Sequence, residues 1–352
     1  MGNTIALAKS YVPNLDEIYK LSSLSAVLTS DQGLARPGAK ANEIMIPKIS
    51  MGGLGDYSRS AGYAQGDVDL DWESVKFNFD RGRRFTVDVE DDEETINVAF
   101  GRLGAEFMRT KVVPEVDAFT FAKLSEKAGT VAEGTLASGT DVTAAITAAN
   151  SVMDDAEVPA EGRILFITPT HYNAIEGLQT IESRDMLARF SQIIKVPQAR
   201  FYTAIAQLDG KTNGQKAGGY VKAANEYTAT GDGSTTEFTI SAKPASLQAV
   251  YVDGTKVTTG WTYTAATGKL VFSSAPANTK AIKAIYNSGA DINFLIAHPS
   301  AVIKFSKRVV GNVIPPELNS ESDGYILKFR EYDLVDVLEN KVNGVYVHAK
   351  AL

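Results

Sequence analysis

The chain has 352 residues, 44% of them hydrophobic and 22% charged, with a formal net charge of −7 and no cysteine. This composition is typical of a soluble globular protein with two or three domains, and no apolar run approaches the ~20 residues of a membrane-spanning helix. The absence of cysteine excludes disulfides, thiolate catalysis and cysteine-bound zinc, and the acidic balance provides no general electrostatic surface for phosphate backbones.

The N-terminal segment, residues 1–42, is predicted to be an extended arm. Its short apolar clusters are interrupted by prolines and glycines, and no long amphipathic pattern is present. An arm that cannot bury its own apolar side chains buries them on a partner, although a flexible terminus would have the same pattern. The segment also mixes charges into its apolar residues, which is unlike a signal peptide.

Residues 43–90 are predicted to form a projecting β-hairpin. A short strand over 43–49 and a Gly/Ser-rich stretch precede a region in which apolar and polar residues alternate with a period of two. The turn is expected at 80–83, where a glycine lies between two alternating runs. No obvious core lies nearby in the sequence, so this hairpin is expected to project and to pack on something other than itself.

Six residues of the hairpin are candidate subunit contacts: Trp72, Phe77, Phe79, Arg81, Arg83 and Arg84. The three arginines form the only tight basic cluster in the chain. They are compatible with nucleic-acid contact, but an ion-pair site between subunits is the preferred interpretation. The acidic residues that alternate with Val68 and Leu70 are interpreted as a solvated strand face, because a calcium loop would need a glycine and a glutamate that are absent.

Residues 91–128 are predicted to form a long helix. Four acidic residues at its start suit the positive end of a helix dipole, and apolar residues follow at helical spacing. Pro114 removes a backbone donor and is expected to kink or divide the helix. At 1.5 Å per residue such a helix spans about 50 Å, which suits a structural spine.

The rest of the chain alternates between α/β and β character. Residues 131–225 contain an amphipathic helix, a buried strand at Ile164–Ile167 and a helix begun by a proline, and the α/β pattern resumes at Ile292–Ala297. Between them, residues 226–287 are rich in Thr and Ser, and short β segments alternate with glycine-containing turns. This shift predicts a small all-β domain, a sandwich or barrel, inserted in a loop. The C-terminal residues are mostly strand.

The sequence has no recognisable catalytic, nucleotide-binding or metal-binding motif. Gly210-Lys211-Thr212 matches only the end of a phosphate-binding loop, and the three histidines, His171, His298 and His348, lack metal-ligand spacing. Trp261 and Tyr263 could line a sugar site but are more typical of a β-domain core. We therefore predict no catalytic residue, no metal and no cofactor. The enzyme hypothesis, a hydrolase that joins His171 and His298, ranks last.

Several segments in order along the chain resemble the major capsid proteins of tailed bacteriophages, above all those of prophages in Gram-positive bacteria. They are EIMIPKISMGGLGDYSR (43–59), VKFNFDRGRRFTVD (75–88), AFGRLGAEFMRTKVVPEVDAFTFAKL (99–124), MDDAEVPAEGRILFITPTHYNAI (153–175), and INFLIAHPSAVIKFSK and VLENKVNGVYVHA near the C-terminus. Their joint occurrence is more specific than any one of them. Residues 226–287 depart from this pattern and resemble small β modules of phage structural proteins.

The resemblance implies an α+β chain with the Hong Kong ninety-seven-type capsid fold. It divides the chain into an N-arm (1–42), an E-loop hairpin (43–90), a P-domain with the spine helix (91–130 and 313–352), an A-domain (131–225 and 288–312) and the inserted all-β domain (226–287). It would be a non-enzymatic shell protein of the virion, assembled in the host cytoplasm.

The implied partners are further copies of the chain, as pentamers and hexamers, with a separate scaffolding protein and a portal. Double-stranded DNA would be enclosed without sequence recognition, and no membrane would be bound. Two alternatives stay open: an encapsulin-like protein compartment, and a tail or adhesin subunit that binds glycans through the β insert.

Overall fold

The computed structural model describes residues 23–29, 36–37, 43–51, 53, 56–57, 59, 63, 65–89 and 98–351. Most of the predicted arm and residues 90–97 of the predicted helix lie outside this range. The described residues divide into two compact units. The first lies within Leu28–Gly104 and Val302–Asp336, and the second within Ile18–Val27, Ala105–Ala301 and Val337–Leu352. Both helices and sheets are present, so the predicted α+β class is confirmed.

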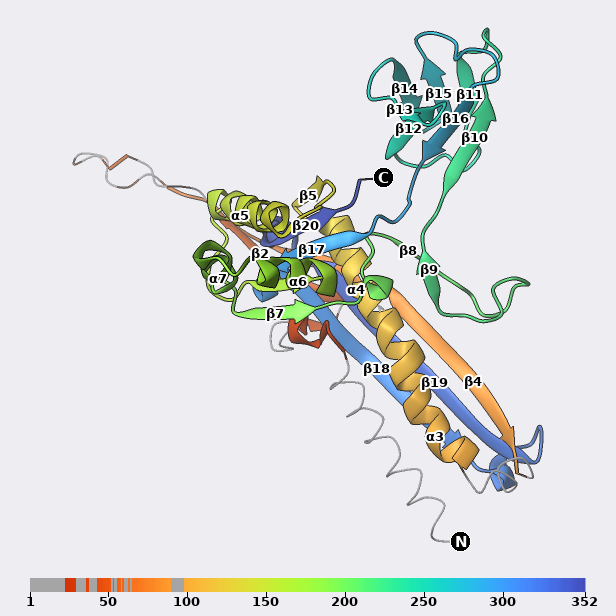
Figure 1. The fold of residues 1–352 in the computed structure, drawn as a ribbon. Coiled ribbons are helices and arrows are strands. Elements are labelled where there is room, and N and C mark those ends of the chain that lie inside the picture. Colours follow the sequence, from red (N-terminus) through yellow and green to blue (C-terminus); the bar gives the residue numbers. More distant parts are fainter. Residues whose placement is uncertain are drawn as a thin grey trace. The chain divides into compact units, whose positions relative to one another are not determined.

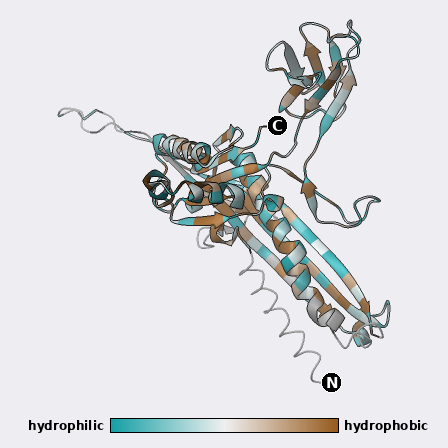
Figure 2. Ribbon diagram, in the orientation of Figure 1, coloured by the Kyte–Doolittle hydropathy of each residue, from teal (hydrophilic) through white to brown (hydrophobic). Residues whose placement is uncertain are grey.

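The first unit contains two antiparallel sheets (Figure 1). A ribbon of order β1-β2-β3 is formed by Arg36–Pro37, Glu43–Met51 and Val68–Lys76. A longer sheet of order β18-β19-β4 is formed by Val302–Ile314, Gly324–Val337 and Phe79–Asp88. Apolar and polar residues alternate along the strands of this longer sheet, as Figure 2 shows, so each strand presents one face to a core.

The predicted turn at 80–83 is wrong. Strand β4 runs through these residues without interruption, and it pairs with β19 from Phe79↔Asp333 to Asp88↔Gly324. The physical reason for Gly82 is a close approach of two backbones, because a Cβ at this position would lie 2.7 Å from the carbonyl oxygen of Phe329. Alternation continues across the glycine, and a glycine inside a strand often marks such a close approach of another backbone.

The predicted long helix is present over 98–127 in three parts. Helix α3 is Val98–Phe107, a π-helical turn covers Met108–Val112, and α4 is Val113–Lys127. Pro114 lies in the first turn of α4, where a missing backbone N–H is tolerated. The expected interruption is therefore found just before the proline, as a change of helix type over Met108–Val112.

The second unit is built around a mixed five-stranded sheet of order β5-β20-β17-β6-β7. Its strands are Thr130–Glu133, Val345–Ala349, Ile292–Ala297, Ile164–Ile167 and Gln192–Lys195. Three helices cover one face of this sheet: α5 (Gly139–Asp155), α6 (Pro169–Leu178) and α7 (Ile181–Leu187). Helix α4 lies on the other face, where Phe121 packs edge-on against Phe166 of β6 with ring centroids 5.2 Å apart.

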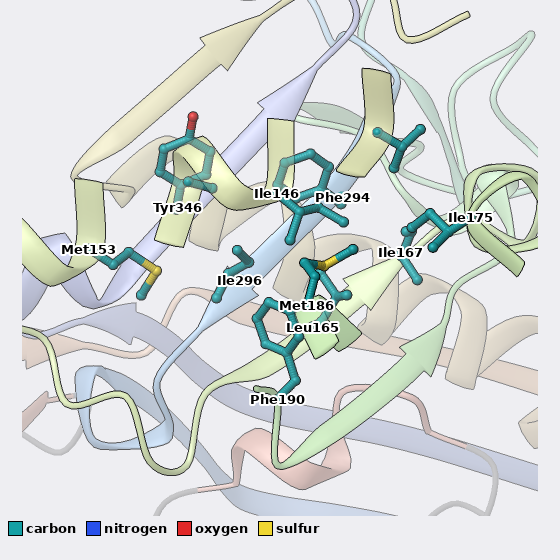
Figure 3. Packing of buried hydrophobic residues seen from close by; sticks show 12 residues of the cluster. Ile146, Met153, Leu165, Ile167, Ile175, Met186, Phe190, Phe294, Ile296 and Tyr346 are labelled. Carbon is teal, nitrogen blue, oxygen red and sulfur yellow. The ribbon is translucent and has the colours of Figure 1, made fainter. Parts of the chain in front are cut away.

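Buried apolar side chains join the three helices to the sheet (Figure 3). The cluster consists of Val142, Ile146, Ala149, Met153, Leu165, Ile167, Ile175, Met186, Phe190, Phe294, Ile296 and Tyr346. Ser138 begins α5 with a capping box, because its hydroxyl accepts from the Asp141 backbone and the Asp141 side chain accepts from the Ser138 backbone. The buried guanidinium of Arg163 joins the end of α5 to β6 through Asn150 Oδ1 (3.1 Å) and Asp154 Oδ1 (2.6 Å).

The C-terminal strand is an internal strand of the five-stranded sheet. β20 lies between β17 and β5, antiparallel to the first and parallel to the second. It therefore belongs to the same sheet as β6, which the sequence placed in the A-domain. Short 3-10 helices lie at Ala26–Leu28, Gln198–Arg200, Pro299–Ala301, Pro316–Leu318 and Glu339–Gly344.

Residues 226–285 form two small antiparallel sheets that share a core. The first, of order β10-β16-β12-β13, consists of Glu226–Thr230, Ala281–Ile285, Ala249–Val252 and Thr255–Lys256. The second, of order β11-β15-β14, consists of Glu237–Thr239, Lys269–Phe272 and Trp261–Thr264. Trp261 and Tyr263 pack against the core between them, as their sequence context favoured. A hairpin of β8 (Ile205–Gln207) and β9 (Tyr220–Lys222) precedes this segment.

Candidate subunit-contact surface

One face of the β2–β3 ribbon is apolar and exposed to solvent. The exposed fractions are 71% for Met51, 69% for Val68, 55% for Leu70 and 39% for Trp72. Met51 pairs with Val68, and residues 68, 70 and 72 alternate along β3, so these four side chains lie on the same side of the ribbon. We call them the apolar ribbon face. A contiguous set of large exposed apolar side chains is typical of a surface that another protein covers.

The opposite face of the ribbon is acidic. Asp69 and Asp71 are exposed and Glu73 is half-buried, and the three alternate with the apolar residues of β3. Their neighbours across the ribbon are Ser50, Lys48 and Ile46. The ribbon thus separates apolar from charged side chains, although the first unit's described residues bury only its base, at Ile44 and Val75.

Two of the predicted contact residues, Phe77 and Phe79, pack against other residues of their own chain. The half-buried ring of Phe77 stacks on Tyr332 with centroids 4.7 Å apart, and Phe305 lies 6.0 Å away. Phe79 is only 3% exposed. These phenylalanines therefore fasten the base of the ribbon to the β18-β19-β4 sheet. Trp72 is the one aromatic residue of the three that remains substantially exposed.

The three predicted arginines lie on β4 but on different faces. Arg81 and Arg83 are half-buried, and Arg84 on the opposite face forms an ion pair with Glu321. The hydrogen bond from Arg84 lowers the pKa of the Glu321 carboxyl. Beside it on the same face, Arg330 donates to both carboxylate oxygens of Asp80 at 2.8 and 2.7 Å. Arg84 thus lies on one face of β4, and Arg81 and Arg83 lie on the other, where Arg81 is directly opposite Glu331 of β19.

A buried polar cluster that the sequence did not reveal lies on α4. Asp117 is fully buried and accepts hydrogen bonds from the hydroxyls of Ser23 (2.8 Å) and Ser25 (2.6 Å). The backbone N–H groups of Leu24 and Ser25 and the guanidinium of Arg200 also donate to it. A buried carboxylate is stable only with such donors, so Asp117 fixes the N-terminal residues 23–25 to the helix. In the sequence, the only sign of this cluster is an acidic residue, Asp117, among the apolar residues of the helix.

Charged groups are also buried in the β18-β19-β4 sheet. Glu331 and Asp333 on β19 and Lys304 on β18 are each at most 4% exposed. Burial raises the pKa of Asp333, although Glu331, Ser306 and Lys304 each act to lower it. The two acids lie two residues apart on the same face of the strand, and the charge of Lys304 favours the ionised form of Asp333.

The histidines do not form a hydrolytic site. His171 Nδ1 lies 2.6 Å from Thr168 Oγ1, whereas His298 Nδ1 lies 2.7 Å from Ser300 Oγ and its Nε2 3.0 Å from the Glu161 carbonyl oxygen. His171 interacts instead with His348, whose pKa is lowered by burial and by His171. No group of three potential metal ligands occurs among the described residues, and no described helix could span a membrane.

The loop at Gly210-Lys211-Thr212 is a turn stabilised by an aspartate. Asp209 Oδ1 accepts from the backbone N–H groups of Lys211 (2.8 Å) and Thr212 (2.9 Å). These are the donors that a phosphate-binding loop would offer to its ligand. Their use by Asp209 agrees with the interpretation of this segment as a turn.

Comparisons with known proteins show the fold of the chain. No protein-family model and no curated protein sequence matches it. Among solved structures, the chain is similar to one titled Gordonia phage Cozz, with 10% identity, a TM-score of 0.51, and coverage of 94% of this chain and 87% of that one. Two others are the asymmetric unit of the bacteriophage PhiM1 mature capsid (10% identity, TM-score 0.49, coverage 88% and 82%) and the capsid of cyanophage P-SCSP1u (14%, 0.48, 90% and 85%).

The similarity to the Gordonia phage protein is a similarity of fold. It extends over most of both chains, so a fold found in phage proteins, expected from the sequence, is confirmed. At this level of identity the shared fold does not determine what the chain does.

Proposed function

We propose that the chain is the major capsid protein of a tailed bacteriophage. Copies of it would assemble as pentamers and hexamers into an icosahedral shell that encloses double-stranded DNA. The observation that carries this proposal is the apolar ribbon face, which a single copy leaves exposed. The shared fold with a phage protein supports the same conclusion.

The apolar ribbon face is a favourable contact because burial removes its side chains from water. Fully burying one large apolar side chain contributes roughly 1.5–3 kcal/mol. Charged residues on the opposite face of the ribbon, including Asp69 and Asp71, keep the free subunit soluble and confine the contact to the apolar side. Trp72 is the residue most typical of an energetic centre in such an interface.

Each segment of the domain division stated above would have a role in the shell. The E-loop hairpin (43–90) would hold the ribbon against a neighbour, and the A-domain (131–225 and 288–312) would meet its symmetry mates near the local axes. The N-arm (1–42) would add a second contact. Several weak contacts per subunit make a shell cooperative, because after the first contact forms each further one is effectively intramolecular.

The remaining partners follow from the same proposal. A separate scaffolding protein and a portal would take part in assembly in the host cytoplasm, and the finished protein would reside in the virion capsid. The net charge of −7 suits a shell that encloses DNA without gripping it.

The test is electron microscopy of the purified chain, expressed with and without its neighbouring scaffold gene. Closed shells, or rings of five and six subunits, are expected. Shells filled with protein would indicate a cargo compartment, and fibres would indicate a tail protein. A uniform monomer under both conditions would contradict the proposal.

Substitutions in the ribbon make the test specific. Leu70→Asp together with Trp72→Asp should leave the subunit folded and prevent closure of the shell. Ile181→Asp is a matched control, because this isoleucine is 78% exposed but lies on α7. Phe79→Asp is unsuitable, because Phe79 is buried in its own chain and its replacement would test folding. Normal shells from the Leu70/Trp72 variant would contradict a contact through the apolar ribbon face.

A further inference from the structure

The surface that covers the apolar ribbon face is expected to be apolar as well, because polar groups buried against it would lose their hydrogen bonds to water. Six of the eleven large apolar side chains that are exposed among the described residues lie between Met51 and Trp72. The other five lie singly on different elements: Val131 on β5, Val152 on α5, Ile181 on α7, Val221 on β9 and Leu318 on the 3-10 helix Pro316–Leu318. Single exposed apolar residues are normal on a protein surface. The described part of the chain therefore offers one extended apolar surface, and this surface is the ribbon itself.

The outer part of the ribbon is a two-stranded sheet. β1 has two residues and reaches only Met45 of β2, so among the described strands β2 and β3 continue as a pair to Met51↔Val68. A two-stranded sheet is marginally stable by itself, and it needs its apolar face packed on another element. A second sheet can provide this at a separation of about 10 Å.

The charges of the ribbon favour contact between two copies of its apolar face. Across a two-fold axis, a residue near the axis meets itself or its close neighbours. From Met51↔Val68 to Pro47↔Trp72 the residues paired on the apolar side are uncharged, so no like charges would meet there. The opposite face carries Asp69, Asp71 and Lys48, and these side chains stay in water on the outside of such a contact.

The contact is small. Four exposed side chains amount to an apolar patch on the order of a few hundred Å². A stable complex buries about 800 Å² per partner. Free subunits should therefore stay separate at low concentration, and the contact should form where other contacts already hold copies together.

We infer that the apolar ribbon face of one copy packs on the same face of a second copy across a two-fold axis, as the two sheets of a small sandwich. This inference rests on the proposed function and names the surface that the ribbon meets. A two-fold contact is complete after two copies, so it cannot build a ring of five or six. It links a subunit of one ring to a subunit of the next ring in the shell.

Disulfide trapping with one cysteine per chain tests the symmetry of the contact, because the chain has no cysteine of its own. A single cysteine cross-links two copies only where the same residue of both copies comes together, which a head-to-tail contact does not provide. The axis can lie at any residue of the face, so four separate variants are assembled and oxidised: Met51→Cys, Val68→Cys, Leu70→Cys and Trp72→Cys.

At least one of these four variants should form roughly tenfold more cross-linked dimer than Asp71→Cys, whose side chain lies on the opposite face. A short bis-maleimide is used in parallel, because it joins thiols that are too far apart for a disulfide. Cross-linking of Asp71→Cys equal to that of all four variants, or none at any position with either reagent, would overturn the inference.

Charges introduced at Leu70, in the middle of the face, provide a readout in assembly. Leu70→Lys alone or Leu70→Glu alone should raise the protein concentration needed for assembly roughly tenfold, because like charges then meet across the axis. An equal mixture of the two variants should assemble at a concentration at least roughly threefold lower than either alone, since Lys of one copy can meet Glu of another. Contact with any other surface would give the mixture no such advantage.

Ile181→Lys and Ile181→Glu are the matched controls, because Ile181 is 78% exposed and lies on α7. Neither control should change assembly, alone or mixed. Circular dichroism confirms that each variant is folded.

The outcomes separate this inference from the proposed function. If the unaltered chain forms shells and no position of the face cross-links to itself, the two-fold contact is wrong while the proposed function stands. If the unaltered chain forms neither shells nor rings, the proposed function is wrong, and cross-linking of the concentrated chain still decides the contact. A mixture of the Leu70 variants that assembles no better than either alone would overturn the two-fold contact as well.

Discussion

The hydroxyl of Ser25 donates a 2.6 Å hydrogen bond to the carboxylate of Asp117, ninety-two residues further along the chain. The backbone N–H of the same serine donates to that carboxylate at 3.1 Å. A buried acid on α4 thus holds residues 23–25 through hydrogen bonds.

Replacing Asp117 with Ala should release this segment. The substitution leaves the donors of Ser23, Ser25 and Arg200 without their acceptor, and we expect a loss of about 2–4 kcal/mol in the free energy of unfolding. Denaturant unfolding measures the loss, and limited proteolysis reports whether cleavage near 23–29 becomes faster. Asp117→Asn retains one carbonyl oxygen and should have a smaller effect. Unchanged stability and proteolysis in the Ala variant would show that the segment is held by other contacts.

Gly82 should not tolerate a side chain. A Cβ there would lie 2.7 Å from the Phe329 carbonyl oxygen, so β4 and β19 must separate locally, and we expect Gly82→Ala to cost about 1–3 kcal/mol. Gly53→Ala is the matched control, because no atom lies within 4 Å of the added carbon. Thermal unfolding of both variants measures the difference. Equal melting temperatures would contradict the close approach of the two strands.

The second unit should lose stability in mild acid. His348 Nδ1 lies 3.0 Å from Asn293 Nδ2, which also donates to the Gly134 carbonyl, so this ring nitrogen must accept and cannot carry a proton. Burial, together with His171, lowers the pKa of His348 below the usual 6.5, and burial also lowers that of His171. The unfolded chain therefore binds more protons, and stability falls as the pH drops below about 6.5.

The His348→Asn variant isolates this effect, because an amide oxygen can accept from Asn293 without titrating. The variant should lose less stability than the unaltered chain between pH 7 and pH 5. At pH 8 the two differ only by the lost packing on Phe294, whose ring lies 5.1 Å from the imidazole. Denaturant unfolding at each pH is the measurement, and parallel pH profiles would contradict a role for His348.

The segment 226–287 should be removable. Glu226 pairs directly with Ile285, so the two ends of the segment lie side by side, and its core is its own. At the junction, Asn225 N–H donates to Ser288 Oγ (2.7 Å), and that hydroxyl donates to the Asn225 carbonyl (2.9 Å). A short Gly-Ser linker in place of 226–287 should leave the remaining chain folded with a melting temperature within about 3 °C. Insolubility or a much lower melting temperature would show that the segment supports the rest.

Local patterns were sufficient for the elements whose neighbours are close in sequence. Alternation predicted β structure on both sides of residues 80–83, and helical spacing predicted α3 and α4. Gly82 was assigned to a turn because glycine has the same pattern whether it provides a turn or admits a neighbouring backbone, and that neighbour, Phe329, is distant in sequence. Among the candidate contacts, Phe77 and Phe79 alternate like Trp72, and only the position of β19 determines which of them are buried.

The surroundings of Asp117 and the position of β20 also depend on residues that are distant in sequence, so local patterns do not predict them. A single acid within a helix is ordinarily a solvent-facing residue, and nothing local indicates that Ser23 and Ser25 surround it. The order β5-β20-β17 depends on pairings between strands about fifty and more than two hundred residues apart, which no periodicity encodes.

The position of β20 has a consequence for the timing of folding during synthesis. Its residues, Val345–Ala349, leave the ribosome after every other strand of the five-stranded sheet, yet they lie between β17 and β5. Until they emerge, β5 has no strand beside it and the edge of β17 is open. The nascent second unit therefore cannot complete its sheet, and it has an unpaired strand edge at that stage. Completion of the five-stranded sheet is delayed until translation of this strand is finished.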